Sequence, residues 1–193
     1  MVLVMCRGDA RLGAEAGAGG ADVALEPPGP SPGTVHRRAQ SRVPTFEHMT
    51  IQRMDHVGIV VDDLADAVAF FATLGLELHG EAPVEGDWVD RVVGLEGVRA
   101  QIAMLQTPDG HGRLELTKFH TPSTDGGNQR APANASGIRH VAFAVDDIDA
   151  VLARLRARGA ELVGELGRYR DSYRLCYVRG PEGIIVELAE QIG

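Results

Sequence analysis

The chain is short of cysteine and lysine and has no long hydrophobic segment. Its two cysteines, Cys6 and Cys176, lie far apart, which excludes a disulfide framework and a cysteine-based zinc site. No apolar run approaches the roughly 18 residues of a membrane-spanning helix, so we do not expect the chain to be a transmembrane protein. Lys118 is the only lysine, and guanidinium groups therefore carry almost all of the positive charge.

Positive charge is also in deficit. The 27 acidic residues outnumber the 19 basic ones, and the formal net charge is -8. This excludes a broad basic footprint for nucleic acid or for anionic lipid. With 44% hydrophobic and 24% charged residues, the composition is ordinary for a soluble globular protein. We expect a cytoplasmic protein whose partner is a small-molecule substrate.

Residues 1–48 differ from the rest of the chain. They hold five of the ten prolines and seven of the 24 glycines, and their five arginines balance five acidic residues. A segment like this, without hydrophobic periodicity, cannot bury enough surface to offset its ordering entropy. Its apolar opening is shorter than the roughly 7 to 15 apolar residues of a signal peptide. We expect a dispensable disordered tail before a domain at residues 49–193, with Met49 as an alternative start.

An internal repeat organises the domain. Aligning each residue with the one 84 positions later pairs residues 56–64 with residues 140–148. Of the 26 positions aligned from His56 onward, eleven are identical, too many for chance at one offset. Such a repeat marks a duplicated structural unit. We expect module 1 at residues 53–120, a polar linker at 121–136 and module 2 at 137–191.

Each module predicts the element order βαβββ. A short β-branched run begins each module and predicts a strand, at residues 56–61 and 140–145. Asp62 and Asp146 then stand where helix N-caps belong, and Gly75 and Gly159 follow the apolar stripes as C-caps. Three strands are expected after each helix, at residues 88–93, 98–104 and 113–119 and at residues 160–163, 173–178 and 184–189.

Strand alternation relates two histidines to two glutamates. Side chains at i and i+2 share a face of a strand, so His56 and His140 share faces lined by small residues, which leaves a hollow. Glu115 and Glu187 stand inside apolar runs of the last strands and must point away from the buried face. If the sheet is cupped, these carboxylates point toward the histidines.

These four residues predict a metal site. A buried carboxylate without a partner is costly, and one histidine and one glutamate from each module would satisfy each other by coordinating a divalent ion. Two imidazoles and two carboxylates suit nickel, cobalt, manganese, iron or zinc and leave positions open for substrate. A single strand histidine is more often structural. The duplicated His-to-Glu pattern, spaced 59 residues in one module and 47 in the other, favours the metal.

The segments at residues 55–64 and 181–188 resemble the first and last strands of the vicinal oxygen chelate superfamily. That group includes glyoxalase I, methylmalonyl-CoA epimerase, extradiol dioxygenases and bleomycin- or fosfomycin-resistance proteins. The resemblance covers residues 53–191 and implies an α+β fold. Two βαβββ modules would form a cupped eight-stranded mixed sheet with helices on the convex face, usually in a homodimer. It also implies one divalent metal held by His56, Glu115, His140 and Glu187, a set similar to that of glyoxalase I.

Two positions bear on which member the chain resembles. Val60 stands where bacterial glyoxalase I usually has an arginine that helps to hold glutathione, which argues against glutathione as the thiol. The strand that begins at His56 is closer to methylmalonyl-CoA epimerase, but that family tends to have glutamine at the position of Glu115.

The chemistry that both families share supplies the expected function. A substrate with two vicinal oxygens binds the metal, which acts as a Lewis acid and stabilises the enediolate formed when a proton leaves the adjacent carbon. Glu187 is expected to be the base, with Glu115 second. Since arginine binds carboxylate or phosphate at two points, residues around the hollow are candidate substrate contacts: Trp88, Arg168 and Arg174, and beside them Asp90, Arg170 and Tyr173.

Three functions remain open. The four ligands favour a metal-dependent lyase or isomerase of glyoxalase or epimerase type. A protein that sequesters an antibiotic or another small molecule in the same hollow would normally have lost several ligands. An iron-dependent extradiol dioxygenase would use two histidines and one glutamate and leave the position of Glu115 vacant.

Overall fold

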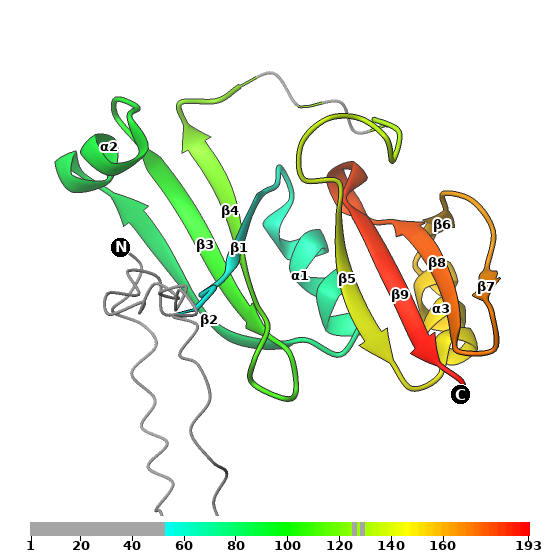
Figure 1. Cartoon of the computed structure of the whole chain (residues 1–193). Helices are drawn as coiled ribbons and strands as arrows, with labels where there is room; N and C mark the ends of the chain where they lie inside the picture. The colour runs from blue at the N-terminus through cyan, green and yellow to red at the C-terminus, as the bar shows by residue number, and fades with distance from the viewer. Residues whose placement is uncertain (1–52, 125–126, 128–129) are drawn as a thin grey trace, which may run out of the picture. The chain divides into compact units, whose positions relative to one another are not determined.

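The computed structural model describes residues 53–124, 127 and 130–193, and residues 54–193 form one compact unit (Figure 1). The predicted tail at residues 1–48 and part of the predicted linker lie outside the described residues. In the part of the chain that is described, no helix is long and apolar enough to cross a membrane.

Both modules begin with a strand and a helix. Module 1 contains β1 (Val57–Val60), α1 (Leu64–Thr73), β2 (Glu77–Glu85), α2 (Asp87–Val93), β3 (Arg99–Gln106) and β4 (Arg113–Thr121). Module 2 contains β5 (His140–Val145), α3 (Ile148–Ala157), β6 (Glu161–Leu162), β7 (Gly167–Tyr169), β8 (Tyr173–Arg179), the 3-10 turn η1 (Pro181–Gly183) and β9 (Ile185–Gln191).

The strands form one hydrogen-bonded sheet per module. The order is β1-β4-β3-β2 in module 1 and β5-β9-β8-β6 in module 2, where β7 also pairs with β8. β1 runs parallel to β4, and β5 runs parallel to β9, while the other pairs are antiparallel. The predicted α+β fold of two such modules is confirmed. The strands are divided between two sheets, however, because β1 and β5 are each the edge strand of their own sheet.

The helix N-caps lie one residue later than predicted, and the C-caps lie one residue earlier. Asp63 and Asp147 are the N-caps, and each side chain accepts a hydrogen bond from the backbone N–H three residues on. Gly75 and Gly159, predicted as C-caps, directly follow the C-cap residues Leu74 and Arg158 with φ of 102° and 83°, a left-handed backbone that favours glycine.

Residues 88–93 form helix α2 and not the predicted strand. The valine-rich run suggested β-structure, but Gly86, with φ of 102°, turns the chain out of β2 just before it. Val89 packs against Val98 and Ala100. The Asp90 carboxylate accepts hydrogen bonds from the N–H groups of Gly97, at 2.7 Å, and Val98, at 2.8 Å, which fixes the loop after the helix. Tertiary packing therefore overrides the local strand preference.

One hydrophobic core joins the two modules. It contains Phe71 of α1, Leu116 of β4, Leu155 of α3 and Leu188 of β9, all fully buried. The rings of Phe71 and Phe143 meet at 6.4 Å between centroids. Both sheets therefore turn their helix-bearing faces to the same core, and the opposite faces carry the other half of each strand's side chains.

Glu182 links the modules at the start of α1. Its Oε1 accepts hydrogen bonds from the N–H groups of Asp62, at 2.9 Å, and Asp63, at 3.1 Å. These donors lie at the helix N-terminus, where they have no partner within the helix and where negative charge is favoured. A residue of module 2 thus completes the cap of a helix in module 1.

A substitution at Gly180 tests this junction. A Cβ there would lie 2.8 Å from the Cε1 and Cζ atoms of Phe70, whose side chain is buried in α1. We expect Gly180→Ala to lower the free energy of unfolding by about 1–3 kcal/mol, because the ring must move within a packed core. Urea denaturation measures the change. Gly164→Ala is the control, since a Cβ there meets nothing within 4 Å. Equal losses of stability in both variants would contradict the close packing of Gly180 against Phe70.

Candidate metal centre

Both histidine–glutamate pairs arise from the same strand register. In module 1, the residue opposite Glu115 lies two positions after His56, and in module 2 the residue opposite Glu187 lies two positions after His140. Because residues two apart share a face, each histidine lies on the face of the glutamate in its own module. The two sequence spacings, 59 and 47, therefore produce one local arrangement.

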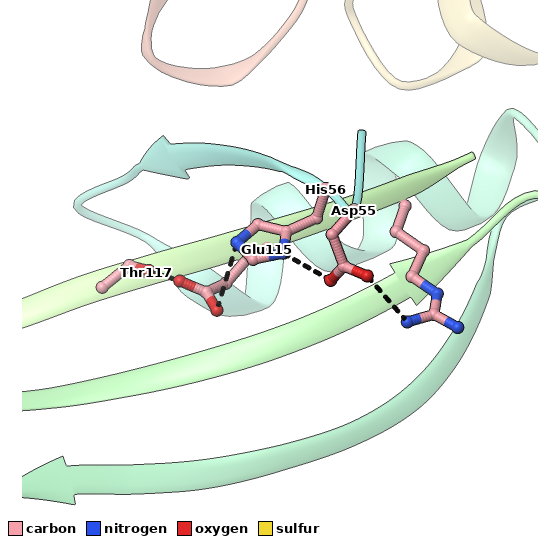
Figure 2. Close-up of polar contacts among 5 residues, drawn as sticks. Asp55, His56, Glu115 and Thr117 are labelled. Atoms are coloured by element: carbon pink, nitrogen blue, oxygen red, sulfur yellow. Dashed lines mark hydrogen bonds and ion pairs between the residues drawn. The ribbon is translucent and has the colours of Figure 1, made fainter. Parts of the chain in front are cut away.

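The pair in module 1 is open. His56 Nδ1 lies 3.1 Å from Asp55 Oδ2, and His56 Nε2 lies 3.9 Å from Glu115 Oε2 (Figure 2). An ionised carboxylate only accepts, so Nδ1 is the donor to Asp55, and a neutral imidazole then has its lone pair on Nε2. Glu115 Oε2 is buried and has no hydrogen-bond partner among the described residues. Two acceptors thus face each other, an arrangement that a cation stabilises.

Strand β4 supports both carboxylates that face His56. Arg113, Glu115 and Thr117 follow each other at every second position and share a face. Arg113 Nη1 lies 3.9 Å from Asp55 Oδ1, and Thr117 Oγ1 donates to Glu115 Oε1 at 3.4 Å (Figure 2). Each carboxylate therefore has one oxygen supported by β4, and its second oxygen faces His56.

The pair in module 2 is closed. His140 Nε2 lies 3.1 Å from Glu187 Oε2, a separation at which an imidazole N–H donates to a carboxylate. His140 Nδ1 faces the hydroxyl of Tyr177 at 3.5 Å, and the two rings lie 5.1 Å apart between centroids. A hydroxyl both donates and accepts, so Tyr177 does not select the tautomer of His140 as a carboxylate would.

The structure brings the four predicted ligands together as two separate pairs, one in each module. Within the described residues, no group of three or more histidine, cysteine, aspartate or glutamate side chains is placed to hold a metal ion. Each pair lies on the face of its sheet opposite the shared core, because Leu114 and Leu116 in β4 and Val186 and Leu188 in β9 fill the core faces. Each module thus presents half of the predicted site.

An apolar wall borders Glu115. On the neighbouring strand β3, Met104 lies opposite Glu115 and Ile102 lies opposite Thr117. Both side chains therefore point to the same face as Glu115, and both are buried. Further along this face, Ala100 contacts Val89 of α2. The carboxylate is therefore screened from water, and its side chain is only 15% exposed.

Tyrosines border Glu187. Tyr177 lies opposite Glu187, Tyr173 lies opposite Gln191, and Tyr169 lies opposite Tyr173. All three tyrosines of the sequence therefore share the face of Glu187. Tyr169 and Tyr173 remain exposed, so a ligand at this face meets aromatic rings and hydroxyl groups.

Of the predicted substrate contacts, Tyr173 shares the face of Glu187, whereas Arg168 and Arg174 do not. Arg174 points to the helix-bearing side of the sheet, where it forms ion pairs with Asp149, at 2.9 Å, and Glu190, at 3.0 Å. The hydrogen bond with Arg174 lowers the pKa of Asp149 below its ordinary value, and the same bond raises the pKa of Arg174. Arg168 lies opposite Arg174 in β7, and its Nη2 is 3.6 Å from Asp171.

Among the other candidate contacts, Asp90 has a role in the fold. Trp88 lies on α2 with 39% of its surface exposed, and Asp90 holds the loop after that helix. Cys176 is buried, and burial raises the pKa of its thiol. The guanidinium of Arg170 lies over the ring of Tyr169, 5.3 Å from its centroid.

Asp55 and Tyr177 are the contacts that the sequence analysis did not assign. Asp55 directly precedes the first histidine, and a carboxylate next to a candidate ligand is a usable signal. Tyr177 alternates with Tyr173 on β8 and could have been placed on the Glu187 face only with the register of β8 and β9.

Comparisons with known proteins agree with this architecture. A glyoxalase family protein from Bacillus cereus, known as a crystal structure, is 52% identical, with a TM-score of 0.72 over 74% of this chain and 96% of that chain. The uncharacterized proteins YwbC of Bacillus subtilis (strain 168) and YaeR of Escherichia coli (strain K12) are each 27% identical, over 72% and 73% of this chain and 98% of their own length. Residues 53–188 match the Glyoxalase/Bleomycin resistance protein/Dioxygenase superfamily, and the chain therefore belongs to it.

Proposed function

We propose that the protein is a divalent-metal-dependent lyase or isomerase of glyoxalase or epimerase type. The open pair of module 1 supports the proposal, because the buried Oε2 of Glu115 has no hydrogen-bond partner among the described residues and lies 3.9 Å from His56 Nε2. A first-row divalent ion binds imidazole nitrogen and carboxylate oxygen and would satisfy both atoms. The residues present therefore fit the metal that the superfamily often uses.

A second copy of the chain completes the site in this proposal. One pair offers two protein ligands, whereas the predicted set has four, and the described residues of one chain do not bring the pairs into one cluster. A two-fold dimer is self-complementary, so the same contact can form twice. His56 and Glu115 of one subunit would then face His140 and Glu187 of the partner subunit, and the homodimer would contain two equivalent sites.

The surroundings of the two glutamates suggest different roles for them. Glu115 is supported by Thr117 and bordered by buried apolar residues, which suits a fixed ligand. Glu187 is more exposed, at 20%, and lies opposite Tyr177 on the neighbouring strand, so a substrate can reach its side chain. We assign Glu187 as the base that takes a proton from a carbon next to a carbonyl or hydroxyl and returns it. A bound divalent ion would supply Lewis-acid polarisation of the substrate oxygens.

Replacement of the base tests the reaction. Glu187→Gln should lower turnover by about 10²–10⁴-fold while three ligands still bind metal, because glutamine cannot accept the proton. The assay uses methylglyoxal with several thiols, with metal content measured by elemental analysis in parallel. A wild-type protein that binds small molecules equally well without metal would instead support the sequestering function named above.

Replacement of Glu115 should move stability in opposite directions with and without metal. In chelator, Glu115→Gln should raise the free energy of unfolding by about 1 kcal/mol, because it removes an unpaired buried carboxylate oxygen. With metal at a hundred times its Kd, wild type should gain about 2.7 kcal/mol and the variant less. Urea denaturation measures both. Glu161→Gln, on an exposed strand position, is the control; absence of any metal effect on wild type would contradict the proposal.

Mixing two defective variants tests the shared site. One variant lacks the module 1 ligands (His56→Ala, Glu115→Gln) and the other lacks the module 2 ligands (His140→Ala, Glu187→Gln). A mixed dimer would contain one intact site, so refolding equal amounts together should restore roughly a quarter of the wild-type metal content, since half of the dimers are mixed. If each site lies within one chain, mixing restores nothing.

A further inference from the structure

The two candidate metal-binding histidines differ in what faces their Nδ1 atoms. His56 Nδ1 has the carboxylate of Asp55 at 3.1 Å, whereas His140 Nδ1 has the hydroxyl of Tyr177 at 3.5 Å. The position that corresponds to Asp55 in the repeat is Arg139, whose Nη2 donates to the carbonyl of Ala131 at 3.4 Å. The duplication therefore preserved the ligands but not their support.

We propose that Asp55 is a positioning residue for the metal centre: it holds His56 in the Nδ1–H tautomer and so keeps the Nε2 lone pair directed at Glu115 before any ion binds. The inference rests on the proposed function, because it concerns the same site. A carboxylate that accepts from the far nitrogen of a metal-binding histidine fixes the ring orientation and raises the basicity of the ligand nitrogen.

The surroundings of Asp55 show that it is itself held in place. Its two oxygens have separate partners, since Oδ2 faces His56 and Oδ1 lies 3.9 Å from Arg113 Nη1 (Figure 2). Arg113 stands two residues before Glu115 on β4. The same strand that presents the carboxylate ligand therefore also anchors the carboxylate that orients the histidine ligand, and the relative position of the two donors is set by one sheet.

Module 2 supplies the contrast within the same molecule. His140 Nε2 lies 3.1 Å from Glu187 Oε2, close enough for an Nε2–H to donate, and no carboxylate is placed at its Nδ1 by the described contacts. In the metal-free protein, His140 is therefore the Nε2–H tautomer and must move that proton before its Nε2 can bind an ion. His56 needs no such change. The module 1 half of the site is preorganised and the module 2 half is not.

The tautomers can be measured directly on the metal-free full-length protein. In ¹⁵N-edited NMR spectra of the imidazole rings, His56 should be the Nδ1–H tautomer and His140 the Nε2–H tautomer. Asp55→Ala should shift His56 toward Nε2–H, because Glu115 then becomes its nearest acceptor. Asp55→Asn should retain Nδ1–H, since the amide oxygen still accepts. Asp171→Ala, which removes a fully exposed carboxylate, is the matched control and should change neither ring.

Metal affinity is the second measurement on the same variants. Calorimetric titration with Mn²⁺, Co²⁺ or Zn²⁺ should give a Kd about 10- to 100-fold higher for Asp55→Ala, a smaller loss for Asp55→Asn and wild-type affinity for Asp171→Ala. Circular dichroism of each variant verifies that it is folded. If Asp55 only contributed an ion pair with Arg113, the loss of metal affinity would not parallel the change of the His56 tautomer, and asparagine would not partly restore the affinity.

The outcomes separate this inference from the proposed function. If wild type binds none of these ions, both the metal-dependent function and the role of Asp55 are wrong. If wild type binds metal, and Asp55→Ala binds it equally well or keeps the Nδ1–H tautomer at His56, the positioning role alone is overturned.

Discussion

The rest of the structure depends on the closure of one hydrophobic core by both modules. Leu114 and Leu116 from β4 and Val186 and Leu188 from β9 bury the helix-bearing faces of the two sheets in the same core. Because side chains alternate across a strand, Glu115 and Glu187 must occupy the opposite faces. The burial of these three leucines and one valine thus decides where the carboxylates lie, and each histidine meets its glutamate through the parallel pairing of the first and last strands.

The duplication made much of this predictable from sequence. His56 directly precedes β1 and His140 begins β5, so their faces follow from period-2 alternation without knowledge of the sheet order. Helix α2 was not predictable in the same way, because a run containing Val89, Val92 and Val93 has strand preference and is made helical by Gly86 before it and by packing of Val89 onto β3. Arg174 was predicted as a substrate contact, but its ion pairs with Asp149 and Glu190 lie on the helix-bearing face of the sheet, which the sequence alone does not indicate.

The separation of the four candidate ligands into two pairs could not be predicted from the amino-acid sequence. The pairing of β1 with β4 and of β5 with β9 is local to each module, and the relation between modules depends on the shared core and on contacts such as that of Glu182 with the start of α1. Asymmetry within the duplication then distinguishes the halves. Module 1 has an anchored carboxylate behind its histidine and an apolar wall beside its glutamate, whereas module 2 has tyrosines in both places.

These differences suggest complementary roles for the two halves in the proposed dimer. In this proposal the preorganised half would hold the ion, and the half that carries Glu187 and the tyrosines would receive the substrate. Anomalous diffraction from crystals grown with Mn²⁺ or Co²⁺ shows directly whether the four side chains form one metal site between two subunits. We expect one anomalous peak per chain, within about 2.0–2.2 Å of His56 Nε2 and Glu115 Oε2 of one subunit and of His140 and Glu187 of the partner subunit. Crystals in which these four side chains bind no ion would contradict this expectation.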